Sequence, residues 1–279
     1  MELLNQAIES EPKPFLRWAG GKNWLIKHLK ETLSDFPFRN YHEPFLGGAS
    51  LFLFIRPQGN CYLSDLNPEL IETYTIVRDN VEGLISELET YRNTKRFYYS
   101  IRDERYRSRI KNAARFIYLN QTSFNGIYRV NLDGVYNVPF GYRSKEFLDP
   151  DNLRLVSEAL QDARLTDYDF YKSLKCIKKD DLVFLDPPYT VSHNNNGFIK
   201  YNQKLFSLND QYRLAKFIRA VKKKGAFYIL TNAAHSKVSE VFGEIDHYVE
   251  LRRASLIGGV NAKRGKVSEF LFTNIPNLI

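Results

Sequence analysis

The chain has 279 residues, of which 43% are apolar and 26% charged, and its net charge is +8. This much apolar material supports a sizeable core and excludes a disordered chain. No apolar run approaches the roughly 18 residues that a membrane span needs. The first fifteen residues lack the apolar centre of a signal peptide. Two cysteines, Cys61 and Cys176, exclude a disulfide scaffold and a multi-cysteine metal site, and they fit a reducing cytoplasm. We expect no metal.

The positive charge is concentrated in one segment. Residues 92–145 hold twelve Lys or Arg and three Asp or Glu, so they carry the whole positive excess. Aromatic residues are interleaved with these cations, which suits a surface that binds nucleic acid. A solvated helix whose aromatic side chains face its own core fits the same pattern, and the sequence leaves both interpretations open.

Short β-rich runs alternate with helical stretches, which is typical of an α/β domain with a parallel sheet. The first predicted elements are a helix over 23–33, a strand over 41–46, a helix from the Gly-Gly turn through 55, a strand over 60–64, and a helix with Pro68 in its first turn. Helical periodicity continues from 69 to 120. Residues 131–136 predict a β-hairpin with Asp133-Gly134 as its two-residue turn. Strands return at 164–166, 182–185, 226–230, 248–251 and 269–273.

A glycine-bearing junction between strand and helix predicts a cofactor site. Gly47 and Gly48 lie in the run Glu-Pro-Phe-Leu-Gly-Gly-Ala-Ser at 43–50, where glycine lets the backbone approach a ligand closely. Asp65 ends the next strand, a place where a carboxylate accepts hydrogen bonds from ribose hydroxyls. The spacing is not that of a GxxxxGK[ST] loop, which argues against an NTPase. A Gly-Gly turn without a ligand is the alternative.

A second glycine-bearing turn is Arg-Trp-Ala-Gly-Gly-Lys at 17–22. Lys22 stands at the start of a predicted helix, where the helix dipole favours negative charge. A positive charge at this place is unfavourable, which suggests that Lys22 has a partner, such as a carboxylate of the ligand. A surface lysine, with Trp18 as a core residue, is the alternative.

A fully apolar strand, 182–185, ends in Asp186-Pro187-Pro188-Tyr189. Ligands of open α/β sheets bind beyond the carboxyl ends of the strands. The carboxylate of Asp186 and the rigid carbonyl of Pro187 offer two acceptors to one exocyclic amino group, and Tyr189 can lie against the face of a planar base. A proline-rich turn would explain the prolines but not the whole set.

In this order, the motifs resemble those of the Dam-type DNA adenine N6-methyltransferases, the D12 class or alpha group, which use S-adenosylmethionine. The resemblance implies an α/β fold, a Rossmann-like class I S-adenosylmethionine-dependent methyltransferase sheet with an inserted, mainly helical target-recognition domain that bears a β-hairpin. It also implies three parts: residues 1–68 and 161–279 form the catalytic domain, and residues 69–160 form the target-recognition domain.

The resemblance also implies roles for single residues. The cofactor-binding residues would be Trp18, Lys22, Phe45, Gly47, Gly48, Asp65 and Asp186. The catalytic residues would be Asp186, Pro187, Pro188 and Tyr189, with Phe198 or Tyr201 as a possible second face for the base. The DNA-binding residues would be Asn125, Ile127, Arg129 and Arg143, of which Arg129 would read the guanine next to the target adenine.

Two departures from the family pattern bear on these expectations. Ala49 stands where the family usually has the last glycine of Phe-x-Gly-x-Gly, and alanine costs little there if its φ is negative. The chain has Tyr142-Arg143 where the family often has Arg-Tyr, so a recognition site that contains GA is a safer expectation than GATC itself.

We therefore expect a site-specific, adenine-specific DNA methyltransferase that acts on double-stranded DNA. We further expect a monomer, cytoplasmic and encoded by a bacterium or phage, with a possible cognate restriction endonuclease but no stable complex with it. The alternatives are a cytosine N4-methyltransferase, an RNA or protein amide methyltransferase, and a catalytically silent DNA-binding module.

Overall fold

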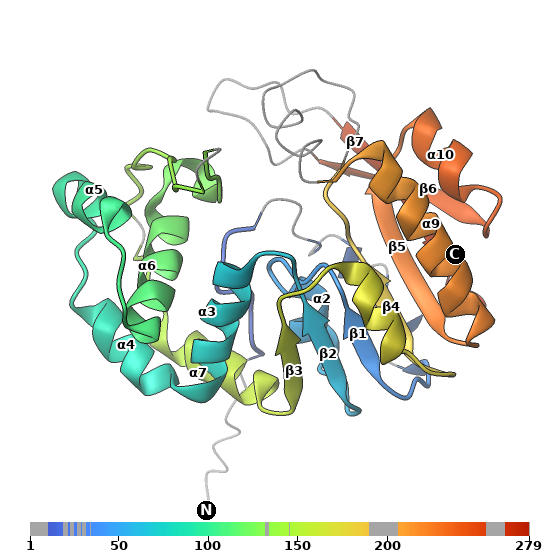
Figure 1. The fold of residues 1–279 in the computed structure, drawn as a ribbon, viewed down its shortest axis with the longest axis horizontal. Coiled ribbons are helices and arrows are strands. Elements are labelled where there is room, and N and C mark those ends of the chain that lie inside the picture. The colour runs from blue at the N-terminus through green and yellow to red at the C-terminus, as the bar shows by residue number, and fades with distance from the viewer. Residues whose placement is uncertain are drawn as a thin grey trace, which may run out of the picture. The chain divides into compact units, whose positions relative to one another are not determined.

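The computed structural model describes residues 11–18, 22, 25–26, 29, 32–33, 35–131, 134–144, 146–189, 206–254 and 266–278. The chain divides into two compact units. Figure 1 labels the helices and strands and colours them along the sequence. The first unit comprises Met1–Asn23, Gly47–Arg56 and Asn67–Leu165, and the second comprises Trp24–Leu46, Pro57–Leu66 and Thr166–Ile279.

The structure has one seven-stranded sheet with the order β3-β2-β1-β4-β5-β7-β6. Its strands are β1 (Tyr41–Glu43), β2 (Cys61–Ser64), β3 (Ala163–Thr166), β4 (Leu182–Leu185), β5 (Phe227–Ala233), β6 (Tyr248–Ala254) and β7 (Lys266–Thr273). Strands β2, β1, β4 and β5 are parallel to one another, whereas β7 is antiparallel to both β5 and β6. The α/β prediction is confirmed. The predicted strand over 41–46 ends early, at Glu43, because Pro44 has no N–H to donate to the sheet.

The strand order reverses between β1 and β4. From β1 the chain adds β2 on one side, and from β4 it adds β5 on the other side. At such a switch point the carboxyl ends of the two central strands form the crevice in which open α/β sheets bind their ligands. Phe45 follows β1 by two residues and Asp186 follows β4 directly.

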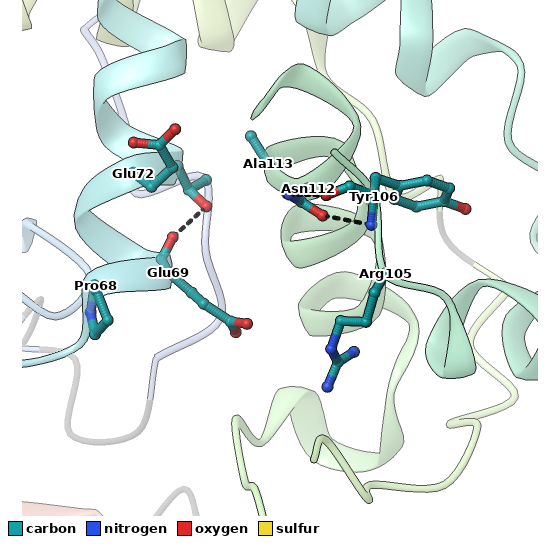
Figure 2. A pocket seen from close by; sticks show the side chains of 8 residues that line it. Pro68, Glu69, Glu72, Arg105, Tyr106, Asn112 and Ala113 are labelled. Carbon is teal, nitrogen blue, oxygen red and sulfur yellow. Dashed lines mark hydrogen bonds between the residues drawn. The ribbon is translucent and has the colours of Figure 1, made fainter. Parts of the chain in front are cut away.

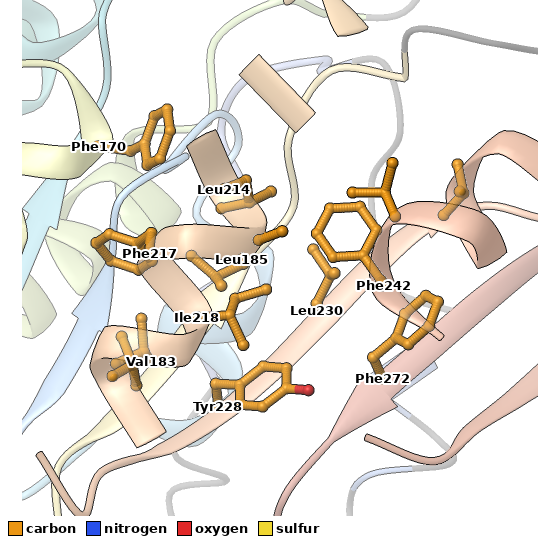
Figure 3. Packing of buried hydrophobic residues seen from close by; sticks show 14 of the residues in the cluster. Phe170, Val183, Leu185, Leu214, Phe217, Ile218, Tyr228, Leu230, Phe242 and Phe272 are labelled. Carbon is orange, nitrogen blue, oxygen red and sulfur yellow. The ribbon is translucent and has the colours of Figure 1, made fainter. Parts of the chain in front are cut away.

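The core of the second unit lies between the sheet and two helices, α9 (Leu208–Lys223) and α10 (Ser236–Phe242), as Figure 3 shows. The apolar strand β4 is buried along its whole length. Helix α9 begins with a capping box in which Ser207 and Asp210 satisfy each other's backbone N–H groups. The short 3-10 helix η2 (Phe170–Lys175) adds Phe170 to this core. This packing fixes the backbone from which Asp186 projects.

The first unit is mainly helical. Its helices are α2 (Ser50–Ile55), α3 (Pro68–Asp79), α4 (Val81–Glu89), α5 (Lys95–Asp103), α6 (Arg109–Thr122) and α7 (Pro150–Leu160), with the 3-10 turn η1 (Phe124–Gly126). Asn67 caps α3 and Pro68 occupies its first turn, as predicted. The continuous periodicity over 69–120 is divided into four helices, and Asn80 both ends α3 and caps α4. In the part of the chain that the structure describes, no helix is both long and apolar enough to cross a membrane.

The hairpin turn differs from the prediction. The Asn131 N–H donates to the carbonyl of Val135 at 2.8 Å, and the Gly134 N–H donates to the carbonyl of Asn131 at 3.1 Å. The loop between the closing pair therefore has three residues, not two, and Gly134 takes the left-handed conformation (φ 73°). The prediction was wrong because Asp-Gly also fits a type I turn followed by a left-handed glycine.

Ala49 has a φ of 53° and a ψ of 28°, so the condition under which alanine would cost little, a negative φ, is not met. It is the N-cap of α2, is fully buried and makes no side-chain capping bond. A left-handed non-glycine residue costs about 1–2 kcal/mol. The turn therefore keeps the backbone that a glycine would favour, and the alanine is strained.

This strain predicts an unusual response to Ala49→Gly. Removing a buried methyl and adding chain entropy normally lowers the free energy of unfolding by about 1–2 kcal/mol. Here the relief of strain offsets that loss, so we expect a change within about 0.5 kcal/mol of zero in urea unfolding. Ala114→Gly, at an equally buried alanine inside α6, is the matched control and should show the full loss. Equal losses in the two variants would contradict the strain.

Candidate active site

Asp186 is half-buried at the carboxyl end of β4. The hydroxyl of Thr231, itself 1% exposed on neighbouring β5, donates a hydrogen bond to Asp186 Oδ1 at 2.8 Å. A carboxylate that accepts such a bond has a defined rotamer, while its half-buried position keeps it accessible to a ligand. Two neighbouring parallel strands, β4 and β5, therefore fix the orientation of the Asp186 carboxylate before a ligand binds.

The remaining residues of the tetrapeptide continue from the same strand. Pro187 is buried, and Pro188 and Tyr189 are half-buried. The hydroxyl of Tyr189 donates to Glu269 Oε2 on β7 at 2.5 Å. The prolines restrict the backbone and this bond restricts the ring, so the tetrapeptide offers a carboxylate, a carbonyl and an aromatic face in a rigid frame.

Besides Asp186, the predicted cofactor residues of the second unit are Phe45 and Asp65, which follow β1 and β2. Phe45 is half-buried and stacks on Phe170, with ring centroids 5.2 Å apart. Asp65 is half-buried, and its N–H donates to the carbonyl of Thr166 at 3.3 Å. Because β2, β1 and β4 are parallel, Asp65, Phe45 and Asp186 all lie at the carboxyl edge of the sheet.

In the first unit, the structure brings Gly47 and Gly48 against Trp18. A Cβ at Gly47, which has a φ of 47°, would lie 2.8 Å from the indole ring, and one at Gly48 would lie 3.1 Å from Trp18 Cβ. Gly47 must therefore be glycine both for its dihedral and for its close contact. Lys22 is 2% exposed, which excludes the surface-lysine alternative, and Trp18 is half-buried.

The Arg17-Trp18 segment is held by helix α6. The Asn120 side chain accepts from the Arg17 N–H at 2.7 Å and donates to the Arg17 carbonyl at 2.9 Å. It also donates to the carbonyl of Gly126 at 3.3 Å. The Trp18 ring stacks on Tyr128 with centroids 5.9 Å apart. One fully buried amide thus connects a predicted cofactor residue to the segment predicted to read DNA.

The predicted DNA-binding residues lie on and after η1. Asn125 is exposed with a φ of 55°, and Ile127 is half-buried. Arg129 is exposed, and its Nε donates to Asn137 Oδ1 across the hairpin at 2.8 Å. Phe124 is 51% exposed. This segment therefore presents an oriented guanidinium and an unburied aromatic ring together.

Arg143 is half-buried and contacts Gln121 Oε1 at 3.5 Å. Burial and the nearby charge of Arg143 lower the pKa of Arg17 below its usual value. Two guanidinium groups that repel each other gain when an anion binds near them, and a DNA phosphate is such an anion. The neighbouring Tyr142 is 71% exposed with a φ of 52°.

The basic segment contains both buried and exposed side chains. Among its aromatic residues, Tyr98, Phe116, Tyr118, Tyr136 and Phe140 are buried and form core, whereas Phe124 and Tyr142 are exposed. Among its cations, Arg115 is buried and donates to the carbonyls of Ile101 and Arg102 at the end of α5.

A pocket of about 290 Å³ lies between α3 and α6 (Figure 2). It is lined by Pro68, Glu69, Glu72, Thr73, Arg105, Tyr106, Asn112 and Ala113. None of these was predicted to bind a ligand, and the acidic pair is engaged by neighbours: Glu69 accepts from the Tyr128 hydroxyl at 2.9 Å, and Glu72 pairs with Arg109. We assign this pocket no role in catalysis. The described residues contain no cluster of metal-ligating side chains.

The sheet order and the polar residues at its carboxyl edge are consistent with the class I methyltransferase fold. The sequence profile of the D12 class N6 adenine-specific DNA methyltransferases matches residues 18–255. The chain belongs to this family and is an adenine-specific DNA methyltransferase. The cytosine, amide and silent-module alternatives are thereby set aside.

Relatives match along nearly the whole chain. It is 32% identical over 277 residues to the type II methyltransferase M1.LlaDCHI of Lactococcus lactis subsp. cremoris, a match that covers 95% of this chain and 96% of the relative. It is 30% identical over 271 residues to the DNA adenine methylase of Haemophilus influenzae, with 93% and 92% covered. The DNA adenine methylase of Escherichia coli is 29% identical over 277 residues, with 96% and 97% covered.

Sequence reasoning missed three polar or aromatic groups. Thr231 directly follows the apolar run Ile229-Leu230 in β5, and Glu269 directly precedes the run Phe270-Leu271-Phe272 in β7; a polar residue beside such a run is often buried and then needs a partner. Phe124 stands beside an Asn-Gly pair, where a large apolar residue is conspicuous. Their partners and exposure could be found only from the fold.

Thr231→Val tests the orientation of Asp186, because valine keeps the shape and removes the donor. One hydrogen bond to a charged group contributes about 1.5 kcal/mol, so kcat for adenine methylation should fall about tenfold. Thr231→Ser, which retains the hydroxyl, is the control and should stay within about threefold of wild type. A valine variant that turns over at the wild-type rate would show that Asp186 needs no such donor.

Proposed function

We propose that this chain transfers the methyl group of S-adenosylmethionine to the exocyclic N6 amine of an adenine that has left the DNA helix. The target would lie in a short duplex site that contains GA, with GATC as one candidate. The proposal rests chiefly on the half-buried carboxylate of Asp186, preset by Thr231 at the switch point of the sheet.

Asp186 and Pro187 would hold the reacting amine. The carboxylate and the Pro187 carbonyl would each accept one N6 hydrogen, which directs the nitrogen lone pair away from both acceptors. Fixed orientation of this kind contributes on the order of 7–11 kcal/mol to catalysis. The amine gains positive charge as it is methylated and loses a proton afterwards, so Asp186 stabilises that charge without having to be a strong base. Tyr189 would stack on the adenine, whose removal from the helix costs a few kcal/mol.

The residues present fit the proposed cofactor. The left-handed Gly47 lets the Trp18 ring lie against the backbone, where a Cβ would come within 2.8 Å of the indole, and Asp65 stands where a ribose-binding carboxylate is expected. Trp18, Lys22, Phe45, Gly47, Gly48, Asp65 and Asp186 would hold S-adenosylmethionine. When bound, this cofactor supplies a methyl group on a positively charged sulfur. No metal is required for such a transfer.

DNA would be read by the segment after α6. Arg129, oriented by Asn137, would contact the guanine next to the target adenine by two hydrogen bonds. Asn125 and Ile127 would contact neighbouring bases, and the exposed ring of Phe124 would enter the gap that the adenine leaves. Arg143, near Arg17, would bind a phosphate. Phe198 and Tyr201, proposed as the second face for the base, lie outside the described residues.

We further propose that the enzyme acts as a monomer and that residues 1–68, 69–160 and 161–279 divide the work between catalysis and target recognition. Two relatives are named type II methyltransferases and others DNA adenine methylases. A cognate restriction endonuclease, where one exists, would share the recognition site with this enzyme without forming a stable complex.

Asp186→Ala tests the chemistry. Because the alanine removes the acceptor of the amine, transfer of tritium from labelled S-adenosylmethionine to DNA should fall at least about 100-fold. Binding of the same DNA, measured by electrophoretic mobility, should remain. Unchanged turnover would reject the assignment of Asp186.

Arg129→Ala tests the DNA contact. Loss of a bidentate contact removes about 1–3 kcal/mol of discrimination, so methylation should spread to sites without the guanine, as long-read sequencing of methylated DNA would reveal. Arg107→Ala removes an exposed cation from the same basic segment and should weaken binding without changing the sites. If Arg129→Ala leaves the pattern of methylated sites intact, another residue reads that base.

A further inference from the structure

Glu269 is a buried acid that directly precedes an apolar run in β7. It is 1% exposed, and the residues that follow it are Phe270, Leu271 and Phe272. Burying a carboxylate costs several kcal/mol unless strong hydrogen bonds compensate for the lost water. A fold that needed only packing here would be served by another apolar residue. The position therefore calls for a specific use of the carboxylate.

The backbone of Glu269 is held on both sides. Strand β7 lies between β5 and β6, and Glu269 is paired with Ala233 on one and with Leu251 on the other. A strand flanked by two neighbours cannot shift without breaking two sets of backbone hydrogen bonds. The carboxylate therefore projects from a backbone position that the two neighbouring strands hold in place.

This carboxylate accepts the hydrogen bond of the Tyr189 hydroxyl at 2.5 Å. Bonds of an O–H group to an ionised oxygen are short, about 2.5–2.7 Å, and about twice as strong as neutral ones. Tyr189 follows two prolines, which limit its backbone, so the remaining freedom of the side chain is rotation about its own bonds. A strong bond at the far end of the ring removes that freedom.

We propose that Glu269 is a positioning residue that fixes the plane of the Tyr189 ring as a preset platform for the adenine. The inference rests on the proposed function and deepens it. Stacking of a base on an aromatic ring contributes to binding in full only when the ring lies in the right plane before the base arrives. In this proposal the carboxylate, 80 residues away in sequence, acts on the adenine through the ring.

A double-mutant cycle tests the proposal. Tyr189→Phe keeps the ring and removes the donor, and Glu269→Gln keeps an acceptor oxygen but removes its charge. Single-turnover transfer of tritium from labelled S-adenosylmethionine to unmethylated plasmid DNA is measured for the wild type, both single variants and the double variant. We expect each single variant to lose about tenfold in rate, and the Glu269→Gln change to cost less than about twofold once the tyrosine hydroxyl has been removed.

A variant on the same strand separates positioning from folding. Thr273 is buried on β7 and donates to the carbonyl of Tyr228 at 2.6 Å. Thr273→Val should lower the melting temperature, leave the methylation rate unchanged, and add independently to Tyr189→Phe. Because the single Tyr189→Phe variant leaves the strand intact, the proposal stays testable even if Glu269→Gln folds poorly.

The possible outcomes are distinct. If the wild type transfers no methyl group to adenine, the proposed function fails. If the wild type is active but Tyr189→Phe retains the full rate, or if Glu269→Gln costs the same factor with and without the tyrosine hydroxyl, the positioning role of Glu269 is wrong. Non-additive losses in an active, folded enzyme would support it.

Discussion

One buried carboxylate fixes the relation between the two central strands of the sheet. Asp181, directly before β4, accepts hydrogen bonds from the Asn40 side chain at 2.6 Å and from the Lys178 N–H at 2.8 Å, and it bonds to His42 Nε2 on β1 at 2.9 Å. Burial alone would raise the pKa of Asp181, but these hydrogen bonds hold it below its usual value. The ionised group therefore ties the start of β1 to the start of β4. Their register, with Tyr41 opposite Leu182, follows from it.

This register decides where the chemistry can be. Since β1 and β4 begin together and run in parallel, their carboxyl ends form a common edge, and Phe45 and Asp186 are delivered there by backbone alone. The polar groups behind that edge, Thr231 and Glu269, then orient the side chains. Each of these groups costs desolvation and each offsets it through a hydrogen bond to a residue of the tetrapeptide. Two buried polar groups of the second unit thus orient side chains of the proposed catalytic tetrapeptide.

The strands of the sheet could be predicted closely because their signals are local. The predicted strand 182–185 is observed with the same bounds, and Pro68 starts α3 as its place after Asn67 indicates. The tetrapeptide could be predicted for the same reason, since four adjacent residues carry the whole pattern. The partners of its side chains could not. Thr231 lies 45 residues from Asp186 and Glu269 lies 80 from Tyr189, and nothing local indicates which buried polar groups meet.

At two turns, the backbone conformation could not be predicted from the sequence. Ala49 keeps a left-handed φ because the turn from Gly47 into α2 demands it, and the glycine that the family usually has there adopts this conformation without strain. At the hairpin, Asp133-Gly134 suits two loop lengths. The choice between them depends on which residues close the loop, and Asn131 and Val135 do so.

The number of cations in the basic segment overstates how many of them are exposed and unpaired with an acid, as Arg115 and Arg109 illustrate. Arg115 is buried and donates hydrogen bonds to carbonyls in the last turn of α5, and Arg109 is paired with Glu72. Arg129 is different in kind, because Asn137 fixes its direction. Exposed cations such as Arg107 can supply affinity for the phosphate backbone of any DNA sequence. Only a guanidinium group held in a fixed orientation can discriminate between bases. In the proposed function, affinity and specificity would therefore be carried by different members of one segment, which differ in their hydrogen-bond partners rather than in their charge.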